Sequence, residues 1–285
     1  MSDTGIEQVQ LIAAFVILLA MLAWETAHPF LDLFRRSRRD RGVHILRNLA
    51  VGVINSLLIA ALFVGAWLLA AAWAEEHGFG LFNWLSDAAG MPDWAHAAGA
   101  VLVLDAWTYL WHRLNHVVPF FWRFHRVHHA DAHMDVTTAS RFHVGEILFS
   151  SLLRIPLIVL LGVHVWELLL YETMMFAVVQ FHHANIALPE KIDRILRLAI
   201  VTPAMHKVHH SRWRPETDSN YSAFLSIWDR MFGSFRTREK LEEIRLGLDE
   251  FDADEDATFT GLMKMPLAPA ARRAPSIDRK ENLVG

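Results

Sequence analysis

Histidine is the residue type through which this chain is best placed to do chemistry. Thirteen of its seventeen histidines lie between positions 112 and 210, in the short repeats HRLNH, HRVHH, HH and HKVHH. Residues three and four apart share one face of a helix, so each repeat can aim two or three imidazoles at one point. Imidazole is a good ligand for iron, zinc, copper and nickel. At least eight candidate nitrogens are too many for one four- to six-coordinate ion, and the count therefore predicts two metals.

Isolated histidines have a different interpretation. A single imidazole in an apolar segment is more often a hydrogen-bonded core residue than a ligand, and we apply this to His28, His44, His77, His96 and His164. It does not explain two copies of HxxHH and one HxxxH within about a hundred residues. A low-complexity histidine tract is also disfavoured, because apolar and aromatic sequence of ordered character separates the repeats.

Apolar residues make up 53% of the 285 positions and gather in runs long enough to cross a membrane. Residues 49–74 contain no charge, which argues against a soluble helical bundle. Two runs joined near Gly162 carry charges and are either short spans or a hairpin that enters the bilayer and returns. We expect an all-α polytopic membrane protein with about four to five transmembrane or re-entrant helices, over 6–24, 49–74, 94–111, 147–163 and 165–181.

The charges of the connecting loops predict the orientation of these spans. The link 35–47 is strongly basic and belongs on the cytoplasmic side, whereas 75–93 is acidic and lacks Lys and Arg. The first apolar run has an acidic flank rather than the basic start of a signal peptide, so we interpret it as a span with its N-terminus outside. All the histidine repeats then meet in a helical cap at the cytoplasmic face, in a bacterial inner membrane or the endoplasmic reticulum.

Composition excludes several kinds of chemistry. The chain has no cysteine, which rules out disulfides, iron–sulfur clusters and thiolate-bound haem. Neither GxGxxG nor a P-loop occurs, so nicotinamide or flavin chemistry would have to come from a partner. The net charge is −4, and the basic link is better explained by topology and lipid headgroups than by nucleic acid.

A polar stripe runs along the third apolar run. Asp105, Tyr109, His112 and His116 are spaced i, i+4, i+7 and i+11, on one side of a helix. A carboxylate within an apolar span is costly and is usually functional or paired. Asp105 could orient a histidine ring by accepting its free N–H. The alternative is an interhelical hydrogen bond unrelated to metal.

Five motifs in order resemble those of a known family. They are DAWTYLWHRLNH, FWRFHRVHHA, TTASRFHVGE, QFHHANI and HKVHHSRWRPETDSNYSAFLSIWDRMFGSF, together covering about residues 98–235. They resemble the histidine boxes and tail of the fatty acid hydroxylase superfamily, also called the sterol desaturase family. The departures are small: Val144 stands where the family usually has Pro, Ser222 where it has Gly, and Ser234 where it has Thr.

The resemblance implies a non-haem di-iron centre and supplies its ligands. It selects His183 over His182 and leaves His143 as a tenth candidate, either a ligand or a residue that supports one. It implies supporting roles for Asp105, Tyr109 and Asn220, the last holding a metal-bound water or ordering the third box, and structural roles for Trp228 and Asp229. The implied ligands are His112, His116, His125, His128, His129, His183, His206, His209 and His210.

The implied reaction is O2-dependent hydroxylation or desaturation of an unactivated C–H bond in a membrane lipid such as a sterol or fatty acyl chain. Two iron ions, O2 and two electrons would be needed, and zinc can occupy such sites in purified protein. An external donor, cytochrome b5-like or ferredoxin-like with a reductase, would bring the electrons. Basic residues near the boxes could dock this donor or bind lipid headgroups: Arg113, Arg123, Arg126, Lys207, Arg212 and Arg214. A histidine-rich metal-binding or transport protein without oxygenase activity is the alternative function.

The sequence divides into three parts. Residues 1–96 are expected to hold the N-terminal transmembrane helices, and 97–238 the catalytic region with the boxes. Within that region, 188–200 has the pattern of an amphipathic helix on the membrane surface. Residues 239–285 are polar and are expected to form a disordered tail.

Overall fold

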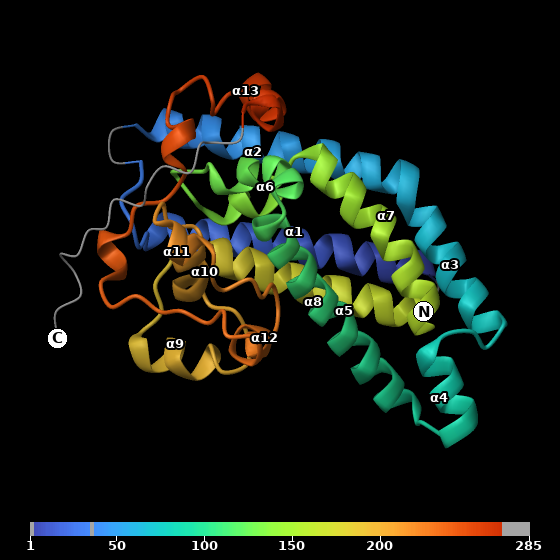
Figure 1. Cartoon of the computed structure of the whole chain (residues 1–285). Coiled ribbons are helices and arrows are strands. Elements are labelled where there is room, and N and C mark those ends of the chain that lie inside the picture. The colour runs from blue at the N-terminus through green and yellow to red at the C-terminus, as the bar shows by residue number, and fades with distance from the viewer. Residues whose placement is uncertain (1–2, 35–36, 270–285) are drawn as a thin grey trace.

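The computed structural model describes residues 3–34 and 37–269, and these residues form an all-helical fold without a β-strand (Figure 1). The long helices are α1 (Asp3–Ala27), α2 (Arg38–Ile59), α3 (Gly65–Glu76), α5 (Asp93–Val117), α7 (Val144–Leu161) and α8 (Val165–His183). The π-helical turn η1 (Ala60–Val64) joins α2 to α3 without a break. Shorter helices are α4 (Leu81–Ala89), α6 (Pro119–His129), α9 (Glu190–Leu196), α10 (Pro203–His209), α11 (Arg214–Thr217), α12 (Ile227–Met231) and α13 (Phe259–Lys264).

The long helices lie lengthwise against one another. α1 packs on α8, α3 on α7, and α5 on both α6 and α8. Gly162 ends α7 with a φ of 70°, a left-handed conformation that glycine adopts without steric cost, and the chain turns back there into α8. The five predicted apolar runs fall within these long helices and η1, except that the run 147–163 extends two residues past the end of α7.

The chain has the surface of a membrane protein. The stretch Arg39–Ala89, made of α2, η1, α3 and α4, and the helix Val144–Leu161 are long and apolar enough to cross a membrane, and Ile12–Ala27 is a shorter apolar helix. Large aliphatic side chains on these helices face outward; Leu57 is 64% exposed and Leu69 is 74% exposed. Such a surface is unfavourable in water and favourable in lipid.

Two ends of the helix bundle can be distinguished in Figure 1. At one end α6, α10 and the C-terminal ends of α5 and α8 meet, and we call it the box end. At the opposite end lie α4, the start of α5 and the α7–α8 turn, which we call the far end. A buried core of Ala71, Phe82, Leu104, Ile158 and Tyr171 holds the helices together between them. The bundle therefore fixes the position of the box end.

The region after residue 238 differs from the disordered tail expected from sequence. As far as residue 269 it is folded, with α13 and three short 3₁₀ turns, and Leu262 is fully buried with Met265 against Val127 and Val51. Although this segment is polar overall, a few of its apolar residues pack against a complementary apolar surface. The remaining residues, 270–285, lie outside the described part.

Candidate metal centre

Nine histidines gather at the box end in two adjacent clusters, with the donor atoms of each cluster within 4.8 Å of one another. They come from α5, α6, the end of α8, and α10 with the residue that follows it, His210. These are the nine ligands implied by the boxes. Centre A contains His112, His116, His125, His129 and His209, and centre B contains His128, His183, His206 and His210.

Each HxxHH box is shared between the two centres. In the second box His125 and His129 belong to centre A and His128 to centre B, whereas in the third box His206 and His210 belong to centre B. The remaining histidine of the third box, His209, belongs to centre A. Residues i and i+4 share a helix face, and residue i+3 is rotated away from i+4 by about a hundred degrees, so one short helix can serve two sites. Neither centre can form without both boxes.

The ring nitrogens within each centre approach as ligands of one ion do. In centre A the Nε2 atom of His112 lies 3.1 Å from that of His125 and 3.0 Å from that of His209. In centre B the Nε2 of His183 lies 3.1 Å from His128 and 3.0 Å from His206. Two ligands at right angles with bonds of about 2.1 Å are separated by about 3.0 Å. The spacing therefore fits a bound metal.

The ring protons of neutral imidazoles cannot explain these contacts in centre A. The Nδ1 atoms of His112 and His209 lie 2.7 Å from the carbonyl oxygen of Tyr221 and 2.6 Å from that of Ser219, and each donates its ring proton there. A neutral imidazole carries only one N–H, so the facing Nε2 atoms both present lone pairs. Only a cation between them makes such a contact favourable. The residues present thus fit a metal pair.

A carboxylate orients one ligand of centre A. The Nδ1 of His125 lies 2.9 Å from Glu146 Oε1, and both side chains are buried. Such an outer acceptor fixes the tautomer of the ring and raises its basicity. Glu146 was part of the TTASRFHVGE motif, but its role was not predicted. His116 Nδ1 has a longer contact, 3.4 Å to Asp218 Oδ1.

Burial keeps the imidazoles in their ligand form. Burial, followed by the charges of neighbouring histidines, holds the pKa values of His128, His129, His206 and His210 well below the usual range. Burial likewise lowers the pKa of His209 to about 3. Neutral rings are the form that binds metal ions.

Aromatic side chains cover the centres. Phe142 stacks on His128 with ring centroids 4.3 Å apart, and the ring of Tyr221 lies 5.0 Å from that of His116. Trp122 lies against His116 and His129. Phe120 faces outward, with 52% of its surface exposed.

Two histidines within the five motifs, His143 and His182, lie outside the centres. His143 caps the first turn of α7, its Nδ1 accepting from Gly145 N at 3.0 Å, and its Nε2 is directed to Met263 O. His182 is buried beside centre B with its ring 3.9 Å from that of His206, but its donor atoms fall outside both clusters. The selection of His183 over His182 agrees with this placement.

The polar stripe of α5 serves two different regions. Asp105 Oδ2 accepts from Trp228 Nε1 at 2.7 Å and from Leu225 N at 3.0 Å, and so holds the chain around α12 rather than a histidine ring. Tyr109 Oη lies 2.9 Å from Ser234 Oγ. The two histidines further along the stripe reach centre A.

Asn220 orders the third box, one of the two roles considered for it. Its backbone has a φ of 52°, and its Nδ2 donates to Met205 O in α10 and to Arg236 O. Asp229 accepts from Tyr221 N and Ser222 N and so closes the loop over centre A. Both residues keep the third box in place.

The basic residues near the boxes are not equally available to a partner. Arg126 is fully buried, and its guanidinium donates to the carbonyls of Met265 and Ala268 beyond α13. Lys207 is also fully buried; its Nζ donates to Ala184 O at 2.8 Å, and burial lowers its pKa to about 7. Docking by these two residues is thereby excluded.

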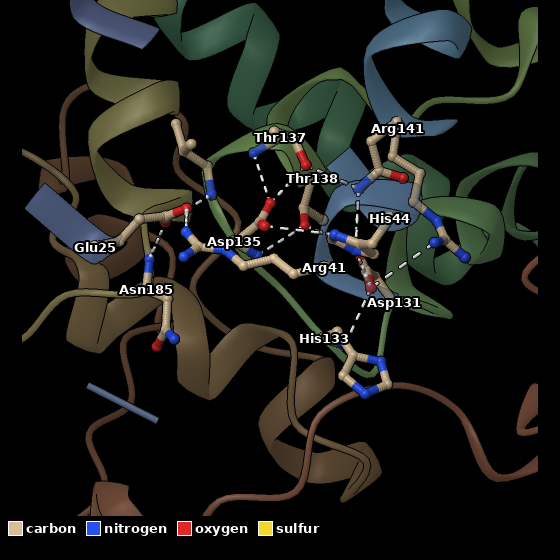
Figure 2. Close-up of polar contacts among 12 residues, drawn as sticks. Glu25, Arg41, His44, Asp131, His133, Asp135, Thr137, Thr138, Arg141 and Asn185 are labelled. Carbon is tan, nitrogen blue, oxygen red and sulfur yellow. Dashed lines mark hydrogen bonds and ion pairs between the residues drawn. The ribbon is translucent and has the colours of Figure 1, made fainter. Parts of the chain in front are cut away.

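A buried polar network lies next to the second box (Figure 2). The sequence predicted His44 as a hydrogen-bonded core residue but did not indicate the other members of the network. His44 Nε2 lies 3.0 Å from both carboxylate oxygens of Asp131, and its Nδ1 lies 3.4 Å from Asp135. Burial alone would raise the pKa of Asp131, but His44 and Arg141 hold it well below the usual range. Arg141 Nε in turn donates to Val127 O within the HRVHH box at 3.0 Å.

Glu25 extends this network to Asn185, as Figure 2 also shows. Its carboxylate accepts from Val136 N at 3.1 Å and from Asn185 N at 2.9 Å, two residues beyond His183. Arg41 lies 3.1 Å from the other oxygen. The N-terminal helices α1 and α2 therefore help to position the boxes.

Comparisons with known proteins agree with this site. Residues 97–234 match the family model described as Fatty acid hydroxylase. The chain is 33% identical over 151 residues to human (Homo sapiens) alkylglycerol monooxygenase, which is 52% of this chain and 32% of that protein. It is 32% identical over 162 residues to ornithine lipid hydroxylase OlsE of Rhizobium tropici, 55% of this chain and 48% of that protein. Human cholesterol 25-hydroxylase is 24% identical over 144 residues, 50% of this chain and 52% of that protein.

The chain spans about a third to a half of the length of these curated relatives. No solved structure matches it significantly. The matched segment contains all nine histidines of the two centres. Residues 97–234 therefore form a domain of the Fatty acid hydroxylase family.

Proposed function

We propose that this protein is a membrane lipid oxygenase that uses a di-iron centre, O2 and two electrons to hydroxylate, or desaturate, an unactivated C–H bond. The observation that carries the proposal is the convergence of nine neutral imidazoles on two adjacent points. Iron bound by such ligands would supply O2 activation and attack on the C–H bond. The lipid hydroxylases among the relatives support a lipid substrate.

The protein's own residues would position this pair and exclude water from it. Carbonyl oxygens and Glu146 take the Nδ1 protons of ligands, which leaves Nε2 directed inward. Phe142, Trp122 and Tyr221 cover the rings. A protected, preorganised site is what a reaction with a reactive oxidant requires.

The arrangement of the helices supports a multi-pass protein with the boxes on the cytoplasmic side. The basic link before and at the start of α2 meets the box end, where Arg41 and His44 join the network. The acidic segment 75–93 belongs to the far end. On α9, Ile192 and Ile195 are exposed, as expected of a helix lying on the membrane surface.

An external carrier, cytochrome b5-like or ferredoxin-like with its reductase, would deliver the electrons. Arg123 and Arg214 are exposed near the box end and could contact an acidic carrier. The alternative function, metal transport, predicts ligands spread through the depth of several helices. The gathering of all nine box histidines at one end favours the enzyme instead.

The decisive experiment compares lipid extracts from cells with and without the gene by mass spectrometry. Hydroxylation inserts one oxygen and would add about 16 mass units to a lipid, whereas desaturation removes two hydrogens and would subtract about 2. Metal analysis must accompany it, because zinc can replace iron during purification. No change in any lipid, with iron and an electron donor present, would contradict the proposal.

A further inference from the structure

A third group of metal-binding side chains lies at the far end, away from the boxes. His96 of α5, His164 in the turn before α8 and Glu167 of α8 place donor atoms within 4.8 Å of one another. Along α5, His96 precedes His112 by sixteen residues, which at 1.5 Å per residue is about 24 Å. The group is therefore separate from centres A and B.

Two glycines bring this group together. A Cβ on Gly80 would lie 2.3 Å from Gly162 N, and a Cβ on Gly162 would lie 2.7 Å from Asn83 Nδ2. The turn before α4 and the turn between α7 and α8 are thus in backbone contact. This contact places Asn83 against His164 and fixes the group before any ligand binds.

The hydrogen bonds of Asn83 determine which atom faces the histidines. Its Nδ2 donates to Phe79 O at 2.8 Å and to Ala74 O at 3.2 Å. Its Oδ1 is left 3.3 Å from His96 Nε2 and 3.1 Å from His164 Nε2. Both imidazoles therefore converge on one amide oxygen.

The proton count at His96 leaves a position for a cation. His96 Nδ1 lies 2.8 Å from Glu167 Oε1, so the ring donates its proton to the carboxylate. A neutral imidazole then has a lone pair on Nε2, and that lone pair faces the lone pairs of Asn83 Oδ1. His96 and Glu167 are 2% and 0% exposed, so bulk water does not relieve this contact. Either a second proton or a metal ion must lie there.

The far-end group repeats the carboxylate–histidine pair of centre A. His96 with Glu167 has the geometry of His125 with Glu146, with separations of 2.8 Å and 2.9 Å. Asn83 Oδ1 lies 3.1 Å from His164 Nε2 and 3.3 Å from His96 Nε2. Two ligands of a tetrahedral metal ion with bonds of about 2.0–2.1 Å are about 3.3 Å apart, so these distances are close to those of a metal site.

We propose that His96 Nε2, His164 Nε2 and Asn83 Oδ1 bind a divalent late first-row metal ion such as Zn²⁺, with Glu167 fixing the ring of His96. Two nitrogens and one amide oxygen form a donor set of intermediate softness, which such ions accept. His164 is only half-buried, which leaves room for water as a fourth ligand. The ion would join α4, α5 and α8 at the far end, independently of lipid oxidation.

The first test measures metal content in the full-length protein purified in detergent and incubated with ZnCl2. We expect His164→Ala to bind one metal fewer per chain than the wild type. ZnCl2 should raise the melting temperature of the wild type more than that of His164→Ala, because it stabilises only a state with an intact site. The control is His77→Ala, which removes an exposed far-end histidine hydrogen-bonded to Trp73 O and should change neither readout.

A second measurement guards against a His164 variant that does not fold. The full-length double variant His128→Ala/His209→Ala, which weakens both centres at the box end, should keep one zinc that is lost when Glu167→Ala is added. Equal zinc content with and without the far-end substitutions would overturn the proposal. That result would mean that His96 carries a second proton and forms a hydrogen-bonded ion pair with Glu167.

Discussion

The box end and the far end both bury histidines, but with different ratios of rings to oxygen acceptors. At the box end nine imidazoles face mainly one another, and carbonyls or Glu146 take their outer protons. At the far end two imidazoles share one amide oxygen, and a single extra proton would satisfy the contacts. A histidine cluster therefore indicates metal most strongly where its lone pairs outnumber the protons that could separate them.

The two regions also differ in how the chain builds them. Six of the nine box-end histidines come from the short helices α6 and α10 with the residue after it, where i and i+4 serve one centre and i+3 the other. The far-end side chains come from α4, α5, α8 and the turn before α8, one residue each, and Gly80 and Gly162 bring them together. The first arrangement leaves a periodic pattern in the sequence, and the second leaves none.

The largest effect should follow removal of one ligand from either box-end centre. His128→Ala takes a nitrogen from centre B and His209→Ala one from centre A, and we expect each to abolish lipid product and lower bound metal. The measurements are product by mass spectrometry and metal per chain. Full activity with normal metal in either variant would remove that residue from the ligand set.

The next largest effect should come from the polar network behind the second box. Asp131→Asn leaves His44 and Arg141 buried without their carboxylate, which typically costs about 3–5 kcal/mol. The melting temperature in detergent measures this loss. The control Asp249→Asn removes an exposed partner of Arg212 and should cost about 1 kcal/mol or less. Equal losses in the two variants would mean that the network contributes no more than a surface ion pair.

A matched pair of carboxylates tests whether the two ends have separate roles. Glu146→Ala frees the ring of His125 and should lower activity or metal affinity about 10–100-fold. Glu167→Ala removes the equivalent partner of His96 and should leave turnover per folded protein unchanged. The turnover rate per folded protein, measured for each variant, tests this difference. If Glu167→Ala reduced turnover as strongly as Glu146→Ala, the two ends would be functionally coupled.

The smallest effect should come from Asp105→Asn. Asparagine keeps an oxygen that can accept from Trp228 Nε1 and Leu225 N, so we expect a loss of about 1 kcal/mol in stability and unchanged metal content. Metal analysis and thermal unfolding of the variant test the two parts of this prediction. A fall in bound metal with unchanged stability would restore the role of orienting a histidine, which was expected from the helical stripe.

The sequence predicted the long helices and the grouping of the box histidines because both depend on local spacing. Apolar runs of membrane length became the long helices, and histidines four apart met in one centre, whereas histidines three apart went to different centres. Contacts across the fold could not be predicted in this way. Nothing near Asp105 in the sequence indicated Trp228 as its partner, 123 positions away. His44 and Asp131 are 87 positions apart; the sequence predicted His44 as a hydrogen-bonded core residue but did not indicate its partner.

The contacts of Arg126 have a consequence for where this protein can be cut. The family match stops at residue 234, yet the guanidinium inside the second box is satisfied by carbonyls at Met265, Ala268 and Pro269. Glu25 from the first helix holds the other side of the same region. The segment that sequence comparison recognises is thus smaller than the unit that folds. A fragment excised at its borders would lose the acceptors of its buried Arg126 guanidinium and of the backbone N–H groups of Val136 and Asn185.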